Sequence, residues 1–389
     1  MSQATPYLKL SGFYFFYFAL LGIMVPYWTL YLKSFGFEAQ VIGVLMAILH
    51  GSRIFAPYLW GRLADETGQR LKIVRWGAAI TWCVFLLIFW QASALGIGLV
   101  MLGFSFFWNA VLPQFEVITL GHLGERKHRY SQIRLWGSVG FIITVAGVGV
   151  LLDWVSVRWL PWMMLLAMVG IWLSSLWVAE PAQQSVATKG SAGQAFRAVL
   201  RQPQVKAFFL ICLLVQLGHG AYYTFYSVLM VDLGYTRTEV GALWAIGVIA
   251  EVVVFVFMHR MIESWGVRNI MIGSLVLCVV RWLLIALIPD QKLPMLFAQT
   301  LHAATFGCLH AVGIALVHQY FSQRSHGQGQ AMYSSFGFGV GGSLGALLSG
   351  FLWDAAGPQW TFGLSALVSV VAIVLAVIWI YPEKVQQNN

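Results

Sequence analysis

Charged side chains are scarce in this sequence. Only 10% of the 389 residues are Asp, Glu, Lys or Arg, whereas 59% are hydrophobic. An ordinary soluble domain carries about 25% charged residues. The composition therefore excludes a soluble protein of this length and predicts a chain that is embedded in a membrane.

Several motifs that would indicate other classes of protein are also missing. The four cysteines lie inside apolar runs without CxxC spacing, which argues against a disulfide framework and against a zinc site. The sequence has no nucleotide-binding loop and no HExxH motif, so an ATP-driven pump is not expected. The net charge of +9 does not indicate a nucleic-acid partner, because the basic residues lie in short loops between apolar runs. We expect no metal site.

Long apolar runs, by contrast, fill the chain. A helix that spans a bilayer needs about 20 mainly apolar residues, and we count twelve such runs. Their approximate limits are 8–32, 39–61, 73–91, 95–121, 132–152, 158–178, 205–231, 238–258, 269–288, 293–319, 328–352 and 359–381. The pattern predicts an all-α membrane protein with an N-terminal six-helix bundle at 1–180, a cytoplasmic linker at 181–203 and a C-terminal six-helix bundle at 204–389.

The distribution of Lys and Arg predicts the orientation. If both termini are cytoplasmic, the inner segments hold sixteen basic residues and the outer loops hold four. Inner loops of membrane proteins carry such an excess of positive charge. We therefore expect a multi-pass protein with both termini in the cytoplasm.

The two halves match when the chain is shifted by 198 residues. The aligned pairs include Gly22 with Gly220, Gly36 with Gly234, Gly68 with Gly266 and Arg70 with Arg268. The same register aligns Arg53 with Glu251. Duplicated halves are typical of secondary transporters, which bind their solute near the middle of the bilayer and alternate access to it.

Five charged residues fall inside the apolar runs: Arg53, Glu116, Arg134, Glu251 and Arg281. A charge at the centre of a bilayer costs at least ~3 kcal/mol, so such a residue needs a partner or a wet cavity. These residues predict a polar chamber inside the protein.

The loop after the second run carries a recognisable motif. It reads GRLADETGQR over residues 61–70, and it resembles the GxxxDxxGxR signature of the major facilitator superfamily. The resemblance covers nearly the whole chain and implies the major facilitator fold. It assigns Gly61, Asp65, Gly68 and Arg70 to a gating loop. Glu66 stands where that family usually has a basic residue, so we expect a different charge network there.

Within this superfamily the chain resembles the lactose-permease branch of proton symporters. Glu116 and Arg134, the latter in IRLWGSVGF, resemble that branch's pair of an acid and an arginine, and they lie at similar depths where an ion pair can form. Glu251, Arg281 and His302 match further charged positions. Two positions depart from the pattern: Phe141 replaces a sugar-stacking Trp, and Thr305 replaces an acid one turn after His302. The proton carrier is then Glu251, His302 or His310.

A closer resemblance is to the phenylpropionate permease group. It rests on GHGAYYTFYS at 218–227, AIGVIAEVVVF at 245–255, the Arg281-Trp282 pair, Arg53, and the spacing of His302, Phe306 and His310. This resemblance implies an arylpropionic acid as the substrate.

Together these patterns assign two groups of residues. The predicted proton-coupling residues are Glu251, His302, Arg281 and His310. The predicted substrate-binding residues are Arg53, Glu116, Arg134, Phe141, Tyr223, His219 and Asn109. The alternatives stay open: Glu116 and Arg134 can form a static bridge, Arg53 can pair with an acid or a backbone carbonyl, and each histidine can be a hydrogen-bonded packing residue.

The favoured function is proton-coupled uptake of a small organic solute, such as the aromatic carboxylate 3-phenylpropionate. We expect a monomer in a bacterial inner membrane that uses a proton gradient and no cofactor. The rivals are a nucleoside or oligosaccharide proton symporter and a drug–proton antiporter. No soluble signalling domain supports a sensor, and no nucleophile–base pair supports an intramembrane enzyme.

Overall fold

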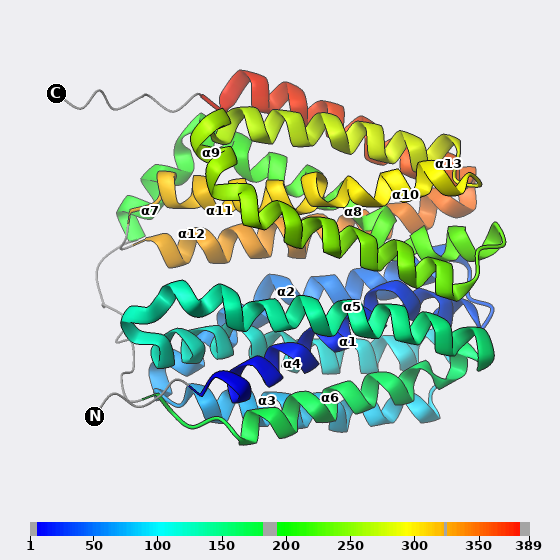
Figure 1. Cartoon of the computed structure of the whole chain (residues 1–389), viewed down its shortest axis with the longest axis horizontal. Helices are drawn as coiled ribbons and strands as arrows, with labels where there is room; N and C mark the ends of the chain where they lie inside the picture. Colours follow the sequence, from blue (N-terminus) through cyan, green and yellow to red (C-terminus); the bar gives the residue numbers. More distant parts are fainter. Residues whose placement is uncertain (1–5, 182–192, 323–324, 382–389) are drawn as a thin grey trace. The chain divides into compact units, whose positions relative to one another are not determined.

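The computed structural model describes residues 6–181, 193–322 and 325–381, and within these ranges every regular element is a helix (Figure 1). Part of the predicted linker, at 182–192, and both chain ends lie outside the described residues. The first part contains α1 (Tyr7–Lys33), α2 (Ala39–Thr67), α3 (Arg70–Phe85), η1 (Leu86–Trp90), α4 (Ala94–Leu123), η2 (Gly124–Arg129), α5 (Tyr130–Trp154), η3 (Val157–Trp159) and α6 (Leu160–Leu176).

The remainder of the chain continues in the same way. It contains α7 (Gly193–Arg201), α8 (Pro203–Asp232), α9 (Arg237–Leu287), α10 (Lys292–Thr300), η4 (Ala303–Cys308), α11 (Leu309–Tyr320), α12 (His326–Met332), η5 (Tyr333–Gly341) and α13 (Gly342–Trp379). The elements η4 and η5 are π-helical. The short helix α7 occupies part of the predicted linker.

Nine helical segments among the described residues are long and apolar enough to cross a membrane. Three of them are much longer than one crossing needs, at 61, 51 and 54 residues. Each contains one break: the 3₁₀ turn η2, Gly266 with φ 72°, or Gly357 with φ 84° directly before Pro358. The nine segments therefore supply twelve membrane-length helices, as the apolar runs predict.

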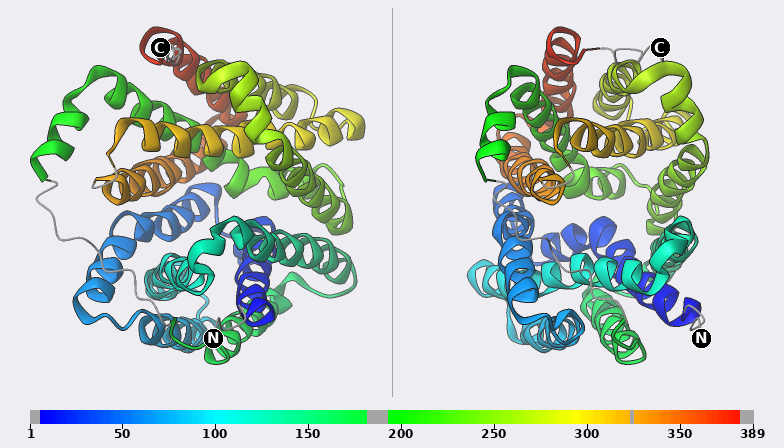
Figure 2. Two further views of the ribbon diagram at one scale, coloured as in Figure 1. Left: turned by 60° about the vertical axis from the view of Figure 1, so that its left-hand side comes forward. Right: turned by 90° about the vertical axis from the view of Figure 1, so that its left-hand side faces the viewer.

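The contacts divide the chain into two compact units. Unit 1 comprises residues 1–188 and 224–245, and unit 2 comprises residues 189–223 and 246–389. In unit 1, α1 packs against α5 and α6, while α4 packs against α2 and α3; the ribbons of these helices can be followed in both views of Figure 2.

Glycine allows helices to touch along their backbones in both units. A Cβ added at Gly22 of α1 would lie 2.6 Å from the Phe141 carbonyl oxygen of α5. A Cβ added at Gly220 of α8 would overlap the backbone of Gly345 in α13. Gly341 approaches the Leu213 carbonyl of α8 in the same manner. Small residues at such spacing permit close helix contact inside a membrane.

The duplication is visible in the backbone as well as in the sequence. Gly36 and Gly234 follow α1 and α8 with φ of 79° and 89°, and Gly68 and Gly266 both have positive φ, of 67° and 72°. Each pair keeps the 198-residue offset. Glycine adopts positive φ without the clash that a Cβ brings, which explains why these positions keep it in both halves.

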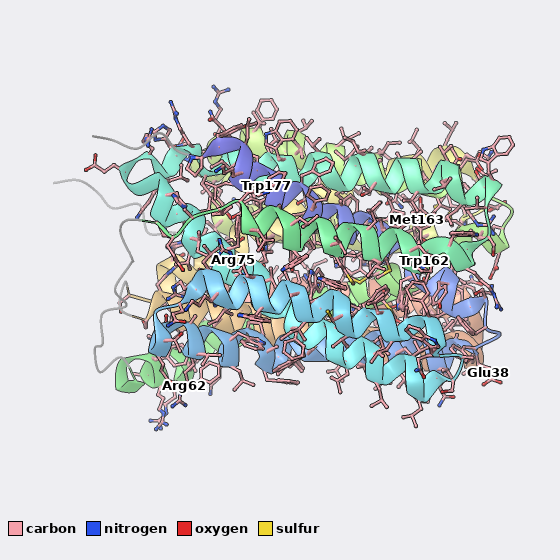
Figure 3. The ribbon with its side chains drawn as sticks, turned by 90° about the horizontal axis from the view of Figure 1, so that it is seen from below. Glu38, Arg62, Arg75, Trp162, Met163 and Trp177 are labelled. Carbon is pink, nitrogen blue, oxygen red and sulfur yellow. The ribbon has the colours of Figure 1, made fainter. Side chains whose placement is uncertain are left out.

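Tryptophans lie exposed at the ends of helices. Trp162 and Trp177, near opposite ends of α6, are 51% and 70% exposed (Figure 3). Glu38 and Arg62 lie toward the two ends of α2 in the same view. Tryptophan is enriched where a bilayer meets water, because its ring is apolar and its N–H is polar. These side chains are suited to the two membrane surfaces.

Replacing Gly220 with Ala is expected to destabilise the protein, because the new methyl group would overlap the backbone of α13. Overpacking of this kind typically costs about 1–3 kcal/mol. Thermal unfolding in detergent measures the effect as a lower midpoint. Gly363→Ala in α13 is the matched control, because a Cβ there meets nothing within 4 Å. Equal midpoints for the two variants would contradict the packing described here.

Candidate functional site

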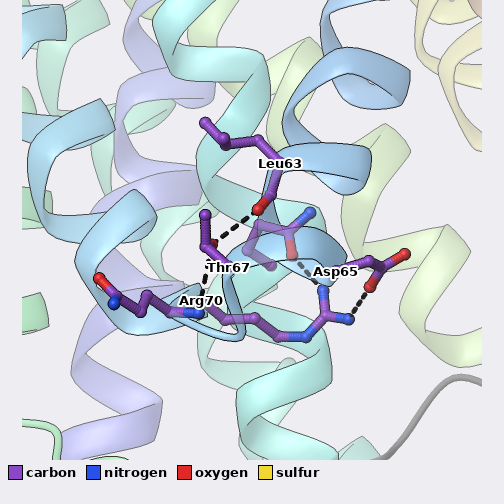
Figure 4. Close-up of polar contacts among 6 residues, drawn as sticks. Leu63, Asp65, Thr67 and Arg70 are labelled. Atoms are coloured by element: carbon purple, nitrogen blue, oxygen red, sulfur yellow. Dashed lines mark hydrogen bonds and ion pairs between the residues drawn. The ribbon is translucent and has the colours of Figure 1, made fainter.

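The predicted gating loop forms a hydrogen-bonded turn between α2 and α3. The guanidinium of Arg70 donates to Asp65 through one nitrogen and to Gln114 of α4 through another (Figure 4). Gly68 ends α2 in the left-handed conformation, and a Cβ on Gly61 would meet Gln114 at 3.9 Å. The loop motif therefore fastens the end of α2 to α4. Asp65 pairs with the loop arginine.

Glu66 has its own partner. Its carboxylate accepts from Nε of Arg62 at 2.7 Å, one helical turn earlier. The neighbouring Thr67 donates its hydroxyl to the Leu63 carbonyl at 2.6 Å (Figure 4). Glu66 thus pairs along α2 and leaves Arg70 to Asp65 and Gln114. This agrees with the expectation of a different charge network.

Glu116 and Arg134 lie in unit 1 but do not form the ion pair that their depths allow. Instead, the Tyr130 hydroxyl donates to Glu116 Oε1 at 3.1 Å, and the Arg134 guanidinium carbon lies 3.7 Å from the centre of the Phe18 ring. No ion pair among the described residues includes Arg134. The static bridge, one of the two alternatives that the sequence left open, is therefore not formed in this structure: Tyr130 and Phe18 contact the two side chains instead.

Arg53 and Asn109 lie in the region where α2 meets α4. The guanidinium of Arg53 lies 5.9 Å from the centre of the Trp108 ring, which in turn stacks on Tyr17 at 5.1 Å. Asn109 donates its side-chain amide to the buried hydroxyl of Ser52 at 2.8 Å. The structure thus holds Asn109 between helices, next to the aromatic surface that Arg53 faces.

Phe141 is half-buried on α5, seven residues after Arg134. Seven residues are nearly two turns of an α-helix, so the two side chains share a face. Unit 1 contains Arg53, Arg134 and Phe141, together with a set of aromatic rings on α1 and α4.

A second polar cluster lies in unit 2, centred on the fully buried Arg281. One guanidinium nitrogen donates to His302 Nδ1 at 3.1 Å and to Thr305 Oγ1 at 2.9 Å. The other donates to Gln299 Oε1 at 3.3 Å. All three partners are neutral acceptors. Arg281 is consequently a buried cation that no carboxylate touches among the described residues.

Aromatic faces complete the surroundings of Arg281. Its guanidinium carbon lies 4.2 Å from the centre of the Tyr222 ring and 4.8 Å from that of Trp282. The Tyr222 hydroxyl donates to the same Gln299 oxygen at 2.7 Å. Cation–π attraction is strongest where water is excluded, as it is here. The rings and the amide hold the guanidinium in one orientation.

Arg281 also determines which nitrogen of His302 carries hydrogen. A guanidinium can only donate, so Nδ1 must accept, and the ring hydrogen of neutral His302 belongs on Nε2. That Nε2 lies 3.7 Å from Glu251 Oε2. The predicted proton-coupling residues Glu251, His302 and Arg281 are therefore neighbours in this order, with the imidazole in the middle.

His219 is fully buried beside this cluster. Its Nδ1 donates to the Val215 carbonyl at 2.8 Å, and its ring packs edge-on against Trp282 at 5.0 Å. The ring centres of His219 and Tyr223 are 5.8 Å apart, and those of His219 and His302 are 6.4 Å apart. His219 and Tyr223 thus form one wall of the cluster.

His302 and His310 belong to one column of rings with Phe306 between them. The His302 and Phe306 centres are 5.2 Å apart and the Phe306 and His310 centres 6.1 Å, each pair within 5° of parallel. An α-helical spacing places the histidines roughly 80° apart. The π-helix η4 occupies the intervening residues, where a wider turn replaces the α-helical one, and the three rings form a single stacked column. His310 Nδ1 lies 3.1 Å from the Tyr333 hydroxyl.

Three features of these sites have no counterpart in the sequence-based assignments. Gln299 was detectable, because a buried amide inside an apolar run is itself unusual. Tyr130 sits at the start of α5, where nothing in the sequence links it to Glu116. The π-helices η4 and η5 have no sequence pattern of their own.

Comparison with known proteins gives a consistent result. Residues 7–364 match the MFS_1 like family. A probable 3-phenylpropionic acid transporter of Escherichia coli (strain K12) is 29% identical over 386 residues, covering 96% of this chain and 97% of that protein. The maltose permease of Geobacillus stearothermophilus is 24% identical over 375 residues, covering 93% and 92%.

Solved structures share the fold at low sequence identity. The crystal structure of the nucleoside transporter NupG has a TM-score of 0.81 at 19% identity, covering 96% of this chain and 98% of the other. A bacterial homologue of the human lysosomal transporter Spinster, in an inward-facing and unoccupied conformation, has a TM-score of 0.67 at 15% identity, covering 96% of each chain. The predicted all-α fold of twelve membrane helices is confirmed. The chain belongs to the MFS_1 like family and is a multi-pass membrane transporter, not an enzyme.

Proposed function

We propose that this transporter couples the uptake of a small aromatic carboxylate, such as 3-phenylpropionate, to the inward movement of protons. It acts as a monomer in a bacterial inner membrane, with both termini in the cytoplasm, and it needs no cofactor besides the proton gradient. One observation carries the proposal: the described residues give the buried Arg281 neutral hydrogen-bond acceptors only, and the acid Glu251 lies just beyond His302.

This arrangement links the proton to the charge of the solute. While Glu251 is ionised, its negative charge offsets the positive charge of Arg281. When Glu251 takes up a proton, the cluster becomes net positive in surroundings of low dielectric constant. An excess charge there is costly unless another charge compensates it. An anionic solute supplies that charge, so binding of the proton and binding of the anion favour each other.

Unit 1 offers a further guanidinium and aromatic rings that suit such a solute. Arg134 lies over Phe18 and forms no ion pair with any described residue, so its planar guanidinium can bind a carboxylate. Phe13, Phe115, Tyr17 and Trp108 stack close by on α1 and α4. Aromatic rings stack favourably on one another. The name of the relative from Escherichia coli points to the same class of compound.

Proteoliposomes test the proposal. With purified protein in a weakly buffered medium, 3-phenylpropionate is expected to cause alkalinisation outside the vesicles, because protons enter with the anion. The neutral analogue 3-phenylpropan-1-ol should cause none. Proton entry with uridine or maltose, and not with the acid, would replace this substrate with one of the rival solutes. Proton release on adding a hydrophobic drug would indicate an antiporter.

A further inference from the structure

A small cavity lies in unit 2 between α8, α11 and η5. Its volume is about 20 Å³, and its lining combines apolar side chains with a few polar ones. A cavity holds a water molecule when it offers at least about 10–15 Å³ and two to four polar partners. The volume therefore suits one water. The polar groups on the lining are Gln216, Thr305, His310 and Tyr333.

Gln216 places an amide on the cavity lining. Its side chain is only 8% exposed, and no hydrogen bond found in the described part of the chain involves this amide. Buried polar groups are generally hydrogen-bonded to protein or to ordered water. A water in the cavity can bind Gln216 and the hydroxyls on the lining at the same time.

Phe306 separates the two predicted proton-coupling histidines. Its ring stands between His302 and His310 and lines the cavity as well. An apolar ring can neither accept nor donate a proton. The lining of the cavity also includes Thr305, which accepts from Arg281, and His310. A water in the cavity can therefore connect the two polar groups without passing through the Phe306 ring.

We propose that this cavity holds a water molecule that carries protons between the cluster of Arg281, His302 and Glu251 and the pair of His310 and Tyr333. The proposal rests on proton coupling as the function. His302 Nδ1 and Thr305 Oγ1 share one donor nitrogen of Arg281, so the two acceptors lie side by side.

Each atom in the transfer can be accounted for. When the guanidinium turns to an anionic solute, it frees the lone pair of His302 Nδ1. Protonated His310 gives its proton to the water, the water gives one of its hydrogens to Thr305 Oγ1, and the hydroxyl's own hydrogen forms a bond to His302 Nδ1. The Nε2–H bond of His302 then breaks and Glu251 takes that proton. Thr305, the water and the charge of His302 end unchanged, and one proton has moved from His310 to Glu251.

Gly337→Ala tests the water directly. Gly337 lines the cavity, and an added Cβ would lie 3.7 to 3.8 Å from atoms of Cys212 and Gln216, which is ordinary contact distance. The methyl group therefore occupies the space without straining the fold. Gly273→Ala is the matched control, because a Cβ there meets nothing within 4 Å. We expect solute-driven proton uptake to fall at least tenfold in Gly337→Ala, while solute exchange stays within twofold of the parent protein.

Two results for Gly337→Ala would contradict the proposal. Normal proton uptake by Gly337→Ala, or a parallel fall of proton uptake and exchange, would overturn the water route.

Gln216→Leu, which removes the polar partner at similar size, should reproduce the selective loss of proton uptake. A structure at a resolution that shows ordered water should place one within hydrogen-bond distance of Gln216 and Thr305, and an empty cavity would refute the proposal. If the parent protein takes up no protons with any solute, the proposed function fails instead.

Discussion

Glu251→Gln is expected to exchange solute across the membrane but to accumulate none against a gradient. Glutamine keeps the size of the side chain and can still face His302 Nε2, which lies 3.7 Å from the carboxylate. It cannot gain or lose a proton. One proton per solute supplies about 1.36 kcal/mol per pH unit, or roughly tenfold accumulation. The variant should therefore lose this factor and approach equal concentrations on both sides.

Two uptake measurements separate these activities. Uptake driven by an imposed pH gradient reports coupling, whereas exchange of labelled for unlabelled solute reports binding and movement of the loaded carrier. Glu263→Gln is the matched control, because Glu263 lies on the same helix but is exposed and pairs with His259 at 3.0 Å. Full accumulation by Glu251→Gln would remove this residue from the coupling mechanism.

Arg134→Gln is expected to weaken the binding of an aromatic carboxylate by about 10- to 100-fold. A hydrogen bond to a charged group contributes about 1.5–3 kcal/mol, and 1.4 kcal/mol corresponds to a factor of ten. Arg134→Lys should recover only part of the affinity. Lysine keeps the charge but loses the planar group that lies 3.7 Å over the Phe18 ring.

Comparison with neutral compounds makes this prediction specific. Binding of 3-phenylpropionate and of 3-phenylpropan-1-ol is measured on the same protein by isothermal titration, and only the acid should respond to Arg134→Gln. Arg62→Gln serves as the control, since Arg62 pairs with Glu66 on the exposed surface of α2. Unchanged affinity for the acid in Arg134→Gln would move the carboxylate site elsewhere in the protein.

Much of the fold could be predicted from the sequence, because a bilayer imposes a simple rule on each helix. Apolar runs of membrane length recur as helices, and the aligned glycines Gly68 and Gly266 both adopt positive φ where one helix gives way to the next. Gly337, Gly341 and Gly345, which are spaced four residues apart in the sequence, pack against α8. In these cases the apolar side chains of a run, or the missing Cβ of a glycine, decide the local structure. Both features can be read directly from the sequence.

The candidate site was less predictable, because it depends on details that no periodic pattern contains. Glu116 and Arg134 have the right depth for an ion pair. The carboxylate of Glu116 instead accepts a hydrogen bond from Tyr130, which directly follows the 3₁₀ turn η2 in the chain. The ring column of His302 and His310 spans a π-helical turn, which has no residue signature. The sequence identified the charged residues, but side-chain orientation decided their partners.

The glycine contacts of α1 with α5, and of α8 with α13, bear on how this transporter can move. In these contacts the two helix backbones touch at glycines, with no side chain between them. If one helix slid along the other, its backbone would run into a larger side chain of the partner helix. Each pair of helices should therefore move as one rigid body during the transport cycle. Changes in helix packing must then occur at other helix–helix interfaces. Random mutagenesis should show that the glycines at these two interfaces, α1 with α5 and α8 with α13, tolerate no larger residue, not even alanine.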